Sequence, residues 1–107
     1  MNTHVAPPAE EMAENAQSAA AYLKTLAHEG RLMILCHLGS GEKSVGELED
    51  LLSIRQAAVS QMLARLRDEG LVAPRRDGKT IYYSLADDNT VQVIGLLYNL
   101  FCKDDCA

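Results

Sequence analysis

Apolar residues recur at helical spacing near the start of the chain. They predict a first helix over residues 12–26 and a second over residues 29–38. The apolar stripe of the first helix consists of Ala16, Ala19, Ala20 and Leu23. The inward face of the second helix is expected to consist of Leu32, Leu35, Cys36 and Leu38. The Gly-Ser-Gly sequence at 39–41 predicts where this second helix ends.

Two helix-capping signals follow in close succession. Ser44 stands three residues before Glu47, and Ser53 stands three residues before Gln56. Each pair matches a capping box, which predicts a short third helix through residue 52 and a fourth from residue 53 to Gly70. Two helices joined by a tight connection are typical of a helix-turn-helix. The stripe of the fourth helix that we expect to face the core consists of Val59, Met62, Leu63 and Leu66.

The periodicity then changes from helix to strand. Residues 71–75 and 80–85 predict two strands, and the Asp77-Gly78 pair between them is typical of a tight hairpin. Asp87 or Asp88 is expected to cap a last helix that ends near Cys102. Together with the first helix, this last helix predicts a two-fold dimer interface, because it carries more apolar residues than one face of a small monomer needs. These residues are Val93, Ile94, Leu96, Leu97, Leu100 and Phe101.

The predicted order of elements is that of a winged helix-turn-helix. This is a mainly α fold of four helices, a two-stranded wing and a last helix, and its 107 residues suit one domain. We interpret residues 1–11 as a flexible N-terminal segment, residues 12–103 as the DNA-binding and dimerisation domain, and residues 104–107 as a C-terminal tail. The sequence has neither a membrane-spanning apolar run nor the pattern of a signal peptide, so we expect a cytoplasmic location.

Charge is unevenly distributed along the chain. The net charge is −5, yet residues 55–79 hold six positive side chains against three negative ones. A basic segment on an acidic body can bind phosphate while the remainder suppresses nonspecific binding. The polar face of the fourth helix is predicted to contact bases in the major groove rather than only solvent. It consists of Arg55, Gln56, Ala57, Ser60, Gln61 and Arg65, and in the wing Arg76 and Lys79 are expected to reach phosphate or the minor groove.

Four segments together resemble the ArsR family of transcriptional repressors. Residues 23–32 resemble the start of that family's second helix, residues 44–48 its third helix, residues 58–63 its recognition helix and residues 75–83 its wing. The resemblance extends over about residues 18–102. It implies a homodimer that binds double-stranded operator DNA and represses transcription.

The cysteines carry a narrower resemblance. Cytosolic thiols are reduced by default, so three cysteines favour redox or metal chemistry over structural disulfides. Residues 34–38 and 97–102 resemble the SqrR, BigR and HlyU branch, whose members use one cysteine at each place to sense persulfides or oxidants. The resemblance implies that reactive sulfur species bridge Cys36 and Cys102 and release DNA. Cys106 departs from the pattern, which leaves the identity of the reacting pair open. A cysteine like Cys36, taken alone, is more often a small buried apolar residue.

Other functions remain open at this point. A thiolate site formed by Cys36, Cys102 and Cys106 would sense As(III), Cd(II) or Zn(II), and the same thiols would suit a peroxide-responsive regulator. A metal-buffering or protein-interaction module that reuses a winged helix is a further alternative. The sequence contains no phosphate-binding loop, zinc-hydrolase pattern or catalytic triad, so we expect neither an enzyme nor a cofactor. The leading interpretation is a thiol-controlled repressor without a metal site.

Overall fold

The structure is a computed structural model that describes residues 8–102. Its helices are α1 (Ala9–Leu26), α2 (Glu29–Leu38), α3 (Val45–Leu52), α4 (Gln56–Asp68) and α5 (Asp88–Phe101). Its strands are β1 (Lys43–Ser44), β2 (Val72–Asp77) and β3 (Thr80–Leu85), which form an antiparallel sheet in the order β1-β3-β2. The predicted winged helix-turn-helix fold is therefore confirmed.

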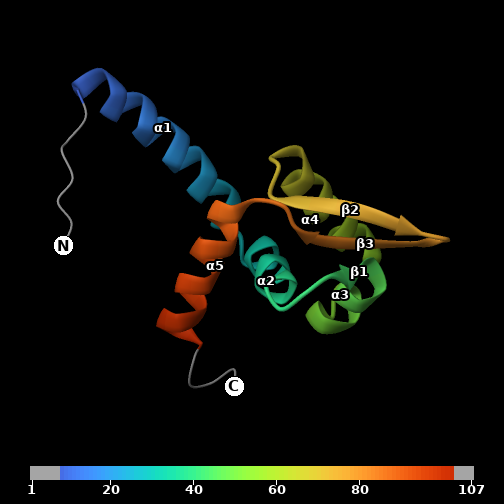
Figure 1. Cartoon of the computed structure of the whole chain (residues 1–107). Helices are drawn as coiled ribbons and strands as arrows, with labels where there is room; N and C mark the ends of the chain where they lie inside the picture. Colours follow the sequence, from blue (N-terminus) through green and yellow to red (C-terminus); the bar gives the residue numbers. More distant parts are fainter. Residues whose placement is uncertain (1–7, 103–107) are drawn as a thin grey trace.

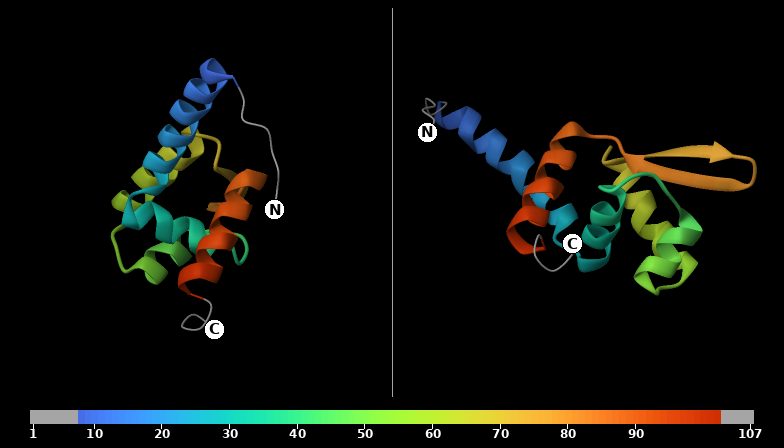
Figure 2. Two further views of the ribbon diagram at one scale, coloured as in Figure 1. Left: turned by 90° about the vertical axis from the view of Figure 1, so that its left-hand side faces the viewer. Right: turned by 60° about the horizontal axis from the view of Figure 1, so that its bottom comes forward.

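The two regions expected to dimerise and to bind DNA lie at opposite ends of an elongated molecule. α1 and α5 occupy one end, and the β2–β3 hairpin projects from the other (Figure 1). The right-hand view in Figure 2 shows the same separation, and the longest dimension of the molecule is 49 Å. No helix within residues 8–102 is long and apolar enough to cross a membrane.

An aliphatic core holds α2, α3 and α4 together. Its fully buried side chains are Ile34, Leu35, Leu48, Val59, Leu63 and Leu66. The predicted inner face of α4 is thus confirmed, with Met62 packed at its margin. The predicted inner face of α2 is wrong at one position, because Ile34 is buried and Cys36 is exposed. Contacts with α3, α4 and β3 bury one side of α2, and position 36 faces the side next to α5.

The first capping box forms and the second does not. The Ser44 hydroxyl accepts a hydrogen bond from the Glu47 amide at 3.0 Å, and the Glu47 carboxylate accepts one from the Ser44 amide at 2.7 Å. Ser53 instead ends α3 in a left-handed conformation, with φ of 57°, and its amide donates to the Glu49 carbonyl. The helix-turn-helix connection therefore leaves Arg55 as the residue before α4, without a side-chain cap.

Several boundaries differ from the prediction. α1 begins at Ala9, so residues 9–11 are helical, and two acidic residues in its first turn favour that start. β1 was not predicted, because a strand of two residues is too short to show an alternating pattern of apolar and polar positions. It adds a third strand to the predicted two-stranded wing. Asp87, one of the two expected caps, caps α5. Residues 1–7 and 103–107, with Cys106 and the predicted C-terminal tail, lie outside the described residues.

Candidate nucleic-acid interface and thiol groove

One face of α4 is fixed to the core and the other is exposed. The exposed side chains include all those predicted to contact bases, namely Arg55, Gln56, Ala57, Ser60, Gln61 and Arg65. Val59, Leu63 and Leu66 hold the opposite face. Because apolar packing determines which face of α4 points inward, its polar face is presented to solvent as a surface that fits a major groove.

The N-terminus of α4 favours an anion more than the other helix starts do. Each of the other four helices has an acidic residue in its first turn, whereas α4 has none and is preceded by Arg55. The exposed amides at a helix start carry partial positive charge, which attracts phosphate. The end of the helix expected to meet DNA therefore lacks the carboxylates that would repel it.

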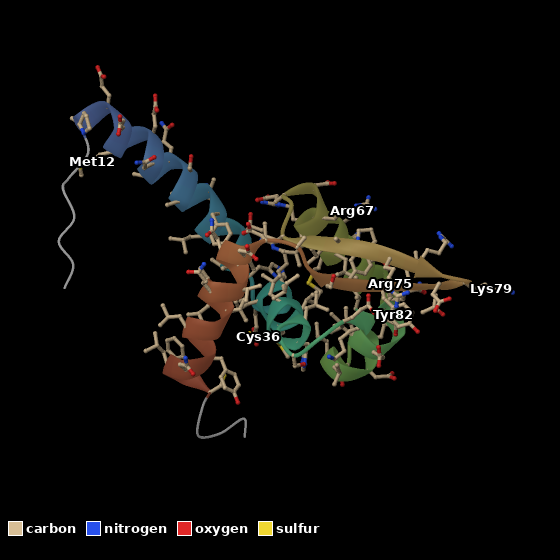
Figure 3. The ribbon with its side chains drawn as sticks, in the orientation of Figure 1. Met12, Cys36, Arg67, Arg75, Lys79 and Tyr82 are labelled. Atoms are coloured by element: carbon tan, nitrogen blue, oxygen red, sulfur yellow. The ribbon has the colours of Figure 1, made fainter. Side chains whose placement is uncertain are left out.

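The wing carries Lys79 at its tip (Figure 3), and Arg76 is an exposed residue of β2. Asp77 pairs with Thr80, so the hairpin turn consists of Gly78 and Lys79, and Gly78 adopts a φ of 65°. That left-handed conformation suits glycine in a two-residue hairpin turn. The turn places the Lys79 ammonium at the point of the molecule furthest along the hairpin.

Arg75 anchors the hairpin rather than extending freely from it. Its guanidinium donates two hydrogen bonds to the Glu42 carboxylate, at 2.9 and 2.8 Å, and stacks 4.9 Å from the centre of the Tyr82 ring. The hydrogen bond from Arg75 lowers the pKa of Glu42, and the same contact raises the pKa of Arg75. Sequence reasoning missed this role, although the hairpin register, which pairs Arg75 with Tyr82, could have revealed the stacking.

A second basic feature missed from the sequence lies between α4 and the hairpin. Two arginines flank a cleft of about 270 Å³ that is lined by Arg67, Pro74, Arg76, Ile81 and Tyr83. Arg67 is exposed and was counted only as part of the basic segment. The alignment of α4 against β2 brings it beside Arg76, which enlarges the positive surface around the predicted DNA-contacting residues.

Cys36 borders a groove between α2 and α5. The groove has a volume of about 520 Å³ and is lined by Cys36, Gly39, Ser40, Leu85, Val91, Ile94, Gly95, Tyr98 and Asn99. None of these side chains is charged. Gly95 has open space where a Cβ would lie, which helps to keep the groove wide beside the thiol. Cys36, on α2 next to α5 (Figure 3), is exposed, so a small molecule in the groove can reach its thiol.

The second predicted cysteine lies near the first. Cys102 ends α5, where its amide donates to the Tyr98 carbonyl at 2.8 Å, and its side chain is half-buried. Partial burial raises the pKa of Cys36 above its ordinary value of 9.0, and the charge of a nearby Cys102 thiolate raises it further. Both thiols are free. The charge of Cys102 therefore affects Cys36, while Cys106 lies outside the described part of the chain.

Metal ligands are sparse around these thiols. Within residues 8–102, no three His, Cys, Asp or Glu side chains are grouped closely enough to hold a metal ion. His28 is engaged as the cap of α2, where its Nδ1 accepts a hydrogen bond from the Arg31 amide at 3.3 Å. Two thiols are fewer than the three or four ligands that zinc sites use.

An exposed recognition helix beside a basic hairpin defines a winged helix-turn-helix DNA-binding protein. Comparison with known proteins agrees with this class. The pattern described as "Bacterial regulatory protein, arsR family" matches residues 28–73. The chain is 50% identical over 98 residues to the biofilm growth-associated repressor of Agrobacterium fabrum, and the matched region covers 92% of this chain and 84% of that protein. The chain belongs to the arsR family of bacterial transcriptional regulators.

Solved structures give the same result. Reduced HlyU from Vibrio cholerae superposes with a TM-score of 0.85 at 44% identity, over 88% of this chain and 99% of that one. The repressor BigR from Xylella fastidiosa superposes with a TM-score of 0.83 at 43% identity, over 92% and 97% of the two chains. These relatives are transcriptional regulators and not enzymes, and this chain is a DNA-binding regulator of the same type.

Proposed function

We propose that this protein is a cytoplasmic, dimeric repressor whose affinity for operator DNA is controlled by Cys36 and Cys102. The observation that carries the proposal is a pair of free thiols, Cys36 on α2 and Cys102 at the end of α5, near enough for the charge of one to affect the other. Cys36 also borders a groove that is open to small molecules. Redox-sensing cysteines are typically accessible to solvent and often lie next to a second, resolving cysteine. Repression is supported by the similarity to the repressors from A. fabrum and X. fastidiosa.

Dimerisation is proposed to use α1 and α5. Leu100 is 65% exposed and Phe101 is 73% exposed, and on α1 Met12 and Leu23 are likewise exposed. Apolar side chains this exposed mark an interface when they lie together. A similar winged-helix domain from Mycobacterium bovis, with a TM-score of 0.73 at 28% identity, is described as homodimeric. In such a dimer the two α4 helices would enter successive major grooves, with Ser60 and Gln61 facing the bases.

The proposed inducer is an organic persulfide, RS–SH. Cys36 loses its proton to solvent, and its raised pKa leaves a small thiolate fraction, which is the species that reacts. This thiolate attacks the terminal sulfur, the S–S bond breaks, and RS⁻ leaves; Cys36 now carries S–SH. The deprotonated product takes a second sulfur in the same way, which gives Cys36–S–S–SH and another RS⁻. The Cys102 thiolate then attacks the middle sulfur and expels HS⁻. The result is a three-sulfur link between α2 and α5.

The link is expected to reduce DNA affinity because α5 belongs to the proposed dimer interface. Tying its last turn to α2 restrains the apolar surface at Leu100 and Phe101, and so the relation between the two protomers. An allosteric coupling of roughly 1–3 kcal/mol is typical and corresponds to a 5- to 150-fold loss of affinity.

The test is operator binding before and after treatment with an organic persulfide. The wild type and Cys106→Ser should bind when reduced and release DNA after treatment, whereas Cys36→Ser and Cys102→Ser should remain bound. Mass spectrometry should find added sulfur atoms between Cys36 and Cys102. A Cys36→Ser protein that still responds, or a Cys106→Ser protein that does not, contradicts the assignment. Release caused by As(III) or Cd(II), with retention of the ion, would instead identify a metal sensor.

A further inference from the structure

Two hydrogen-bonded contacts fasten the last turns of α1 to the rest of the protein. The first joins α1 to α5. The Thr90 hydroxyl donates to the Asp87 carboxylate at 2.8 Å, so it accepts from the Tyr22 hydroxyl, which lies 2.8 Å away. The second contact lies one turn further along α1, at Thr25, and reaches the end of the recognition helix. α1 therefore connects the end of α4 to α5 within two turns.

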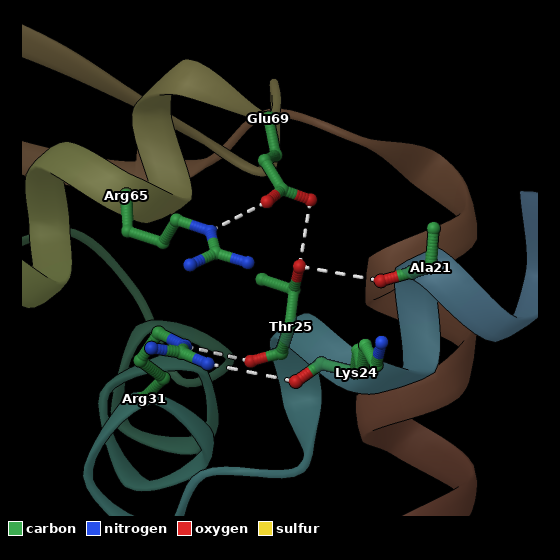
Figure 4. Close-up of polar contacts among 6 residues, drawn as sticks. All are labelled: Ala21, Lys24, Thr25, Arg31, Arg65 and Glu69. Atoms are coloured by element: carbon green, nitrogen blue, oxygen red, sulfur yellow. Dashed lines mark hydrogen bonds and ion pairs between the residues drawn. The ribbon is translucent and has the colours of Figure 1, made fainter.

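Thr25 is a fully buried polar residue whose hydroxyl bonds to a charged acceptor. It donates to Glu69 Oε1 at 2.7 Å, while the Ala21 carbonyl lies at a longer 3.4 Å (Figure 4). Glu69 is the residue that ends α4, and its other oxygen accepts from Arg65 Nε at 2.6 Å. The hydrogen bond from Thr25, and next that from Arg65, lower the pKa of Glu69. Hydrogen bonds to an ionised acceptor are stronger and more directional than neutral ones.

α2 completes the junction from the other side. Arg31 Nε donates to the Thr25 carbonyl at 2.7 Å, and an Arg31 terminal nitrogen lies 3.5 Å from the Lys24 carbonyl. A guanidinium at this position satisfies carbonyls that the end of α1 leaves without helical partners, and its charge suits the negative end of the helix dipole. The end of α1 is thus held by α2 as well as by α4, and this fixes the position of the hydroxyl that Glu69 binds.

The geometry of α4 makes this contact a sensitive one. α4 has 13 residues, so its base-reading N-terminus lies about 20 Å from the end that Glu69 holds. A tilt of about 10° at Glu69 would move the N-terminus by roughly 3 Å, which is close to the rise of one base pair. In a dimer the movement occurs in both protomers, in opposite directions along the DNA.

We propose that Thr25 and Glu69 are positioning residues that set the orientation of α4 relative to α1, and thereby the half-site spacing that the dimer accepts. The inference rests on the proposed dimeric binding of operator DNA. Thr25 is fully buried, and Glu69 follows the end of α4 remote from Gln56, Ser60 and Gln61. Of the side chains predicted to contact bases, Glu69 bonds only to Arg65, so Thr25 acts on DNA binding through helix placement.

The experiment measures half-site spacing preference. An operator is obtained by selection from random DNA, and duplexes are made with its half-sites moved apart or together by one or two base pairs. Binding is compared for the full-length wild type, Thr25→Val and Thr25→Ser by fluorescence anisotropy. Valine preserves the shape of threonine without a hydroxyl, and serine preserves the hydroxyl. Sedimentation and circular dichroism check that each protein is a folded dimer.

The wild type and Thr25→Ser should lose about tenfold in affinity when the spacing is changed, as expected if a displaced reading helix forfeits one good base contact. Thr25→Val should bind the selected and altered spacings within about threefold of each other. The proposal is overturned if Thr25→Val keeps the wild-type preference. It is also overturned if Thr25→Val becomes monomeric or unfolds, because Thr25 would then hold α1 in place rather than orient α4. A wild type that binds as a monomer would contradict the proposed function instead.

Discussion

Linking Cys36 to Cys102 is expected to stabilise the protein as well as change its DNA affinity. The two cysteines stand 66 positions apart, at 36 and 102. In the chain-entropy description, closing a loop of this length destabilises the unfolded state by about 4 kcal/mol. The folded state loses little in return, because α5 is already held to the body of the protein by buried Ile94 and by the Tyr22–Thr90 hydrogen bond.

The length of the link decides how much of this gain appears. A two-sulfur bridge requires Cα atoms about 4.4–6.8 Å apart and is strained outside that range, while each additional sulfur extends the reach by about 2 Å. Because α2 and α5 fix both cysteines on packed helices, we expect the polysulfide-linked protein to gain about 2–4 kcal/mol in free energy of unfolding and the plain disulfide to gain less.

Urea denaturation provides the measurement. Reduced, peroxide-treated and persulfide-treated wild type are unfolded at one protein concentration, since the stability of a dimer depends on concentration. Cys36→Ser, treated identically, is the control for modification of the other thiols. The reasoning is refuted if the free energy of unfolding of the persulfide-treated wild type exceeds that of its reduced form by less than about 1 kcal/mol. It is equally refuted if the control gains as much as the wild type.

Three further outcomes are expected. Lys79→Ala should weaken binding to all DNA sequences and reduce the slope of log affinity against log salt by about one, and an unchanged slope would place the wing tip away from phosphate. Leu100→Asp should sediment as a folded monomer, because Leu100 is exposed and its replacement leaves the core intact. If the variant formed as much dimer as the wild type, α5 would be excluded from the interface. Cys102→Ser should lower the pKa of Cys36, because the substitution removes a neighbouring negative charge. The rate of Cys36 alkylation should then rise at a lower pH than in the wild type. An identical pH profile would show that the two thiols are not neighbours.

The element order could be predicted from the sequence because it depends on local signals. Periodic apolar residues located α2 with both of its bounds correct, and the Asp-Gly pair located the hairpin. The second capping box failed because a Ser followed by Gln three residues later also suits the end of one helix and the start of the next. Only the packing of α3 against α4 decides whether Ser53 ends the first helix or begins the second, and in the structure it ends α3.

The candidate site was less predictable where it depends on tertiary contacts. The exposed face of α4 follows from helical period, so every side chain predicted to lie on it is exposed, although Arg67 near its end was missed. The exposure of Cys36 depends on which side of α2 is covered by its neighbours, and the stripe of apolar residues on α2 extends around most of the helix. The bonds of Arg75 to Glu42 and of Glu69 to Thr25 join residues 33 and 44 positions apart, and no periodicity reports on such pairs.

The contact between Glu42 and Arg75 has an evolutionary consequence. Each residue satisfies the other, and the side-chain link between the hairpin and the segment before β1 is lost if either charge is removed. Single substitutions at either position are therefore expected to be selected against, while a coordinated replacement that restores a donor and an acceptor is neutral. The two positions should drift together among descendants of this sequence, and the hairpin tip, which has no such partner, should be free to vary with the DNA it meets.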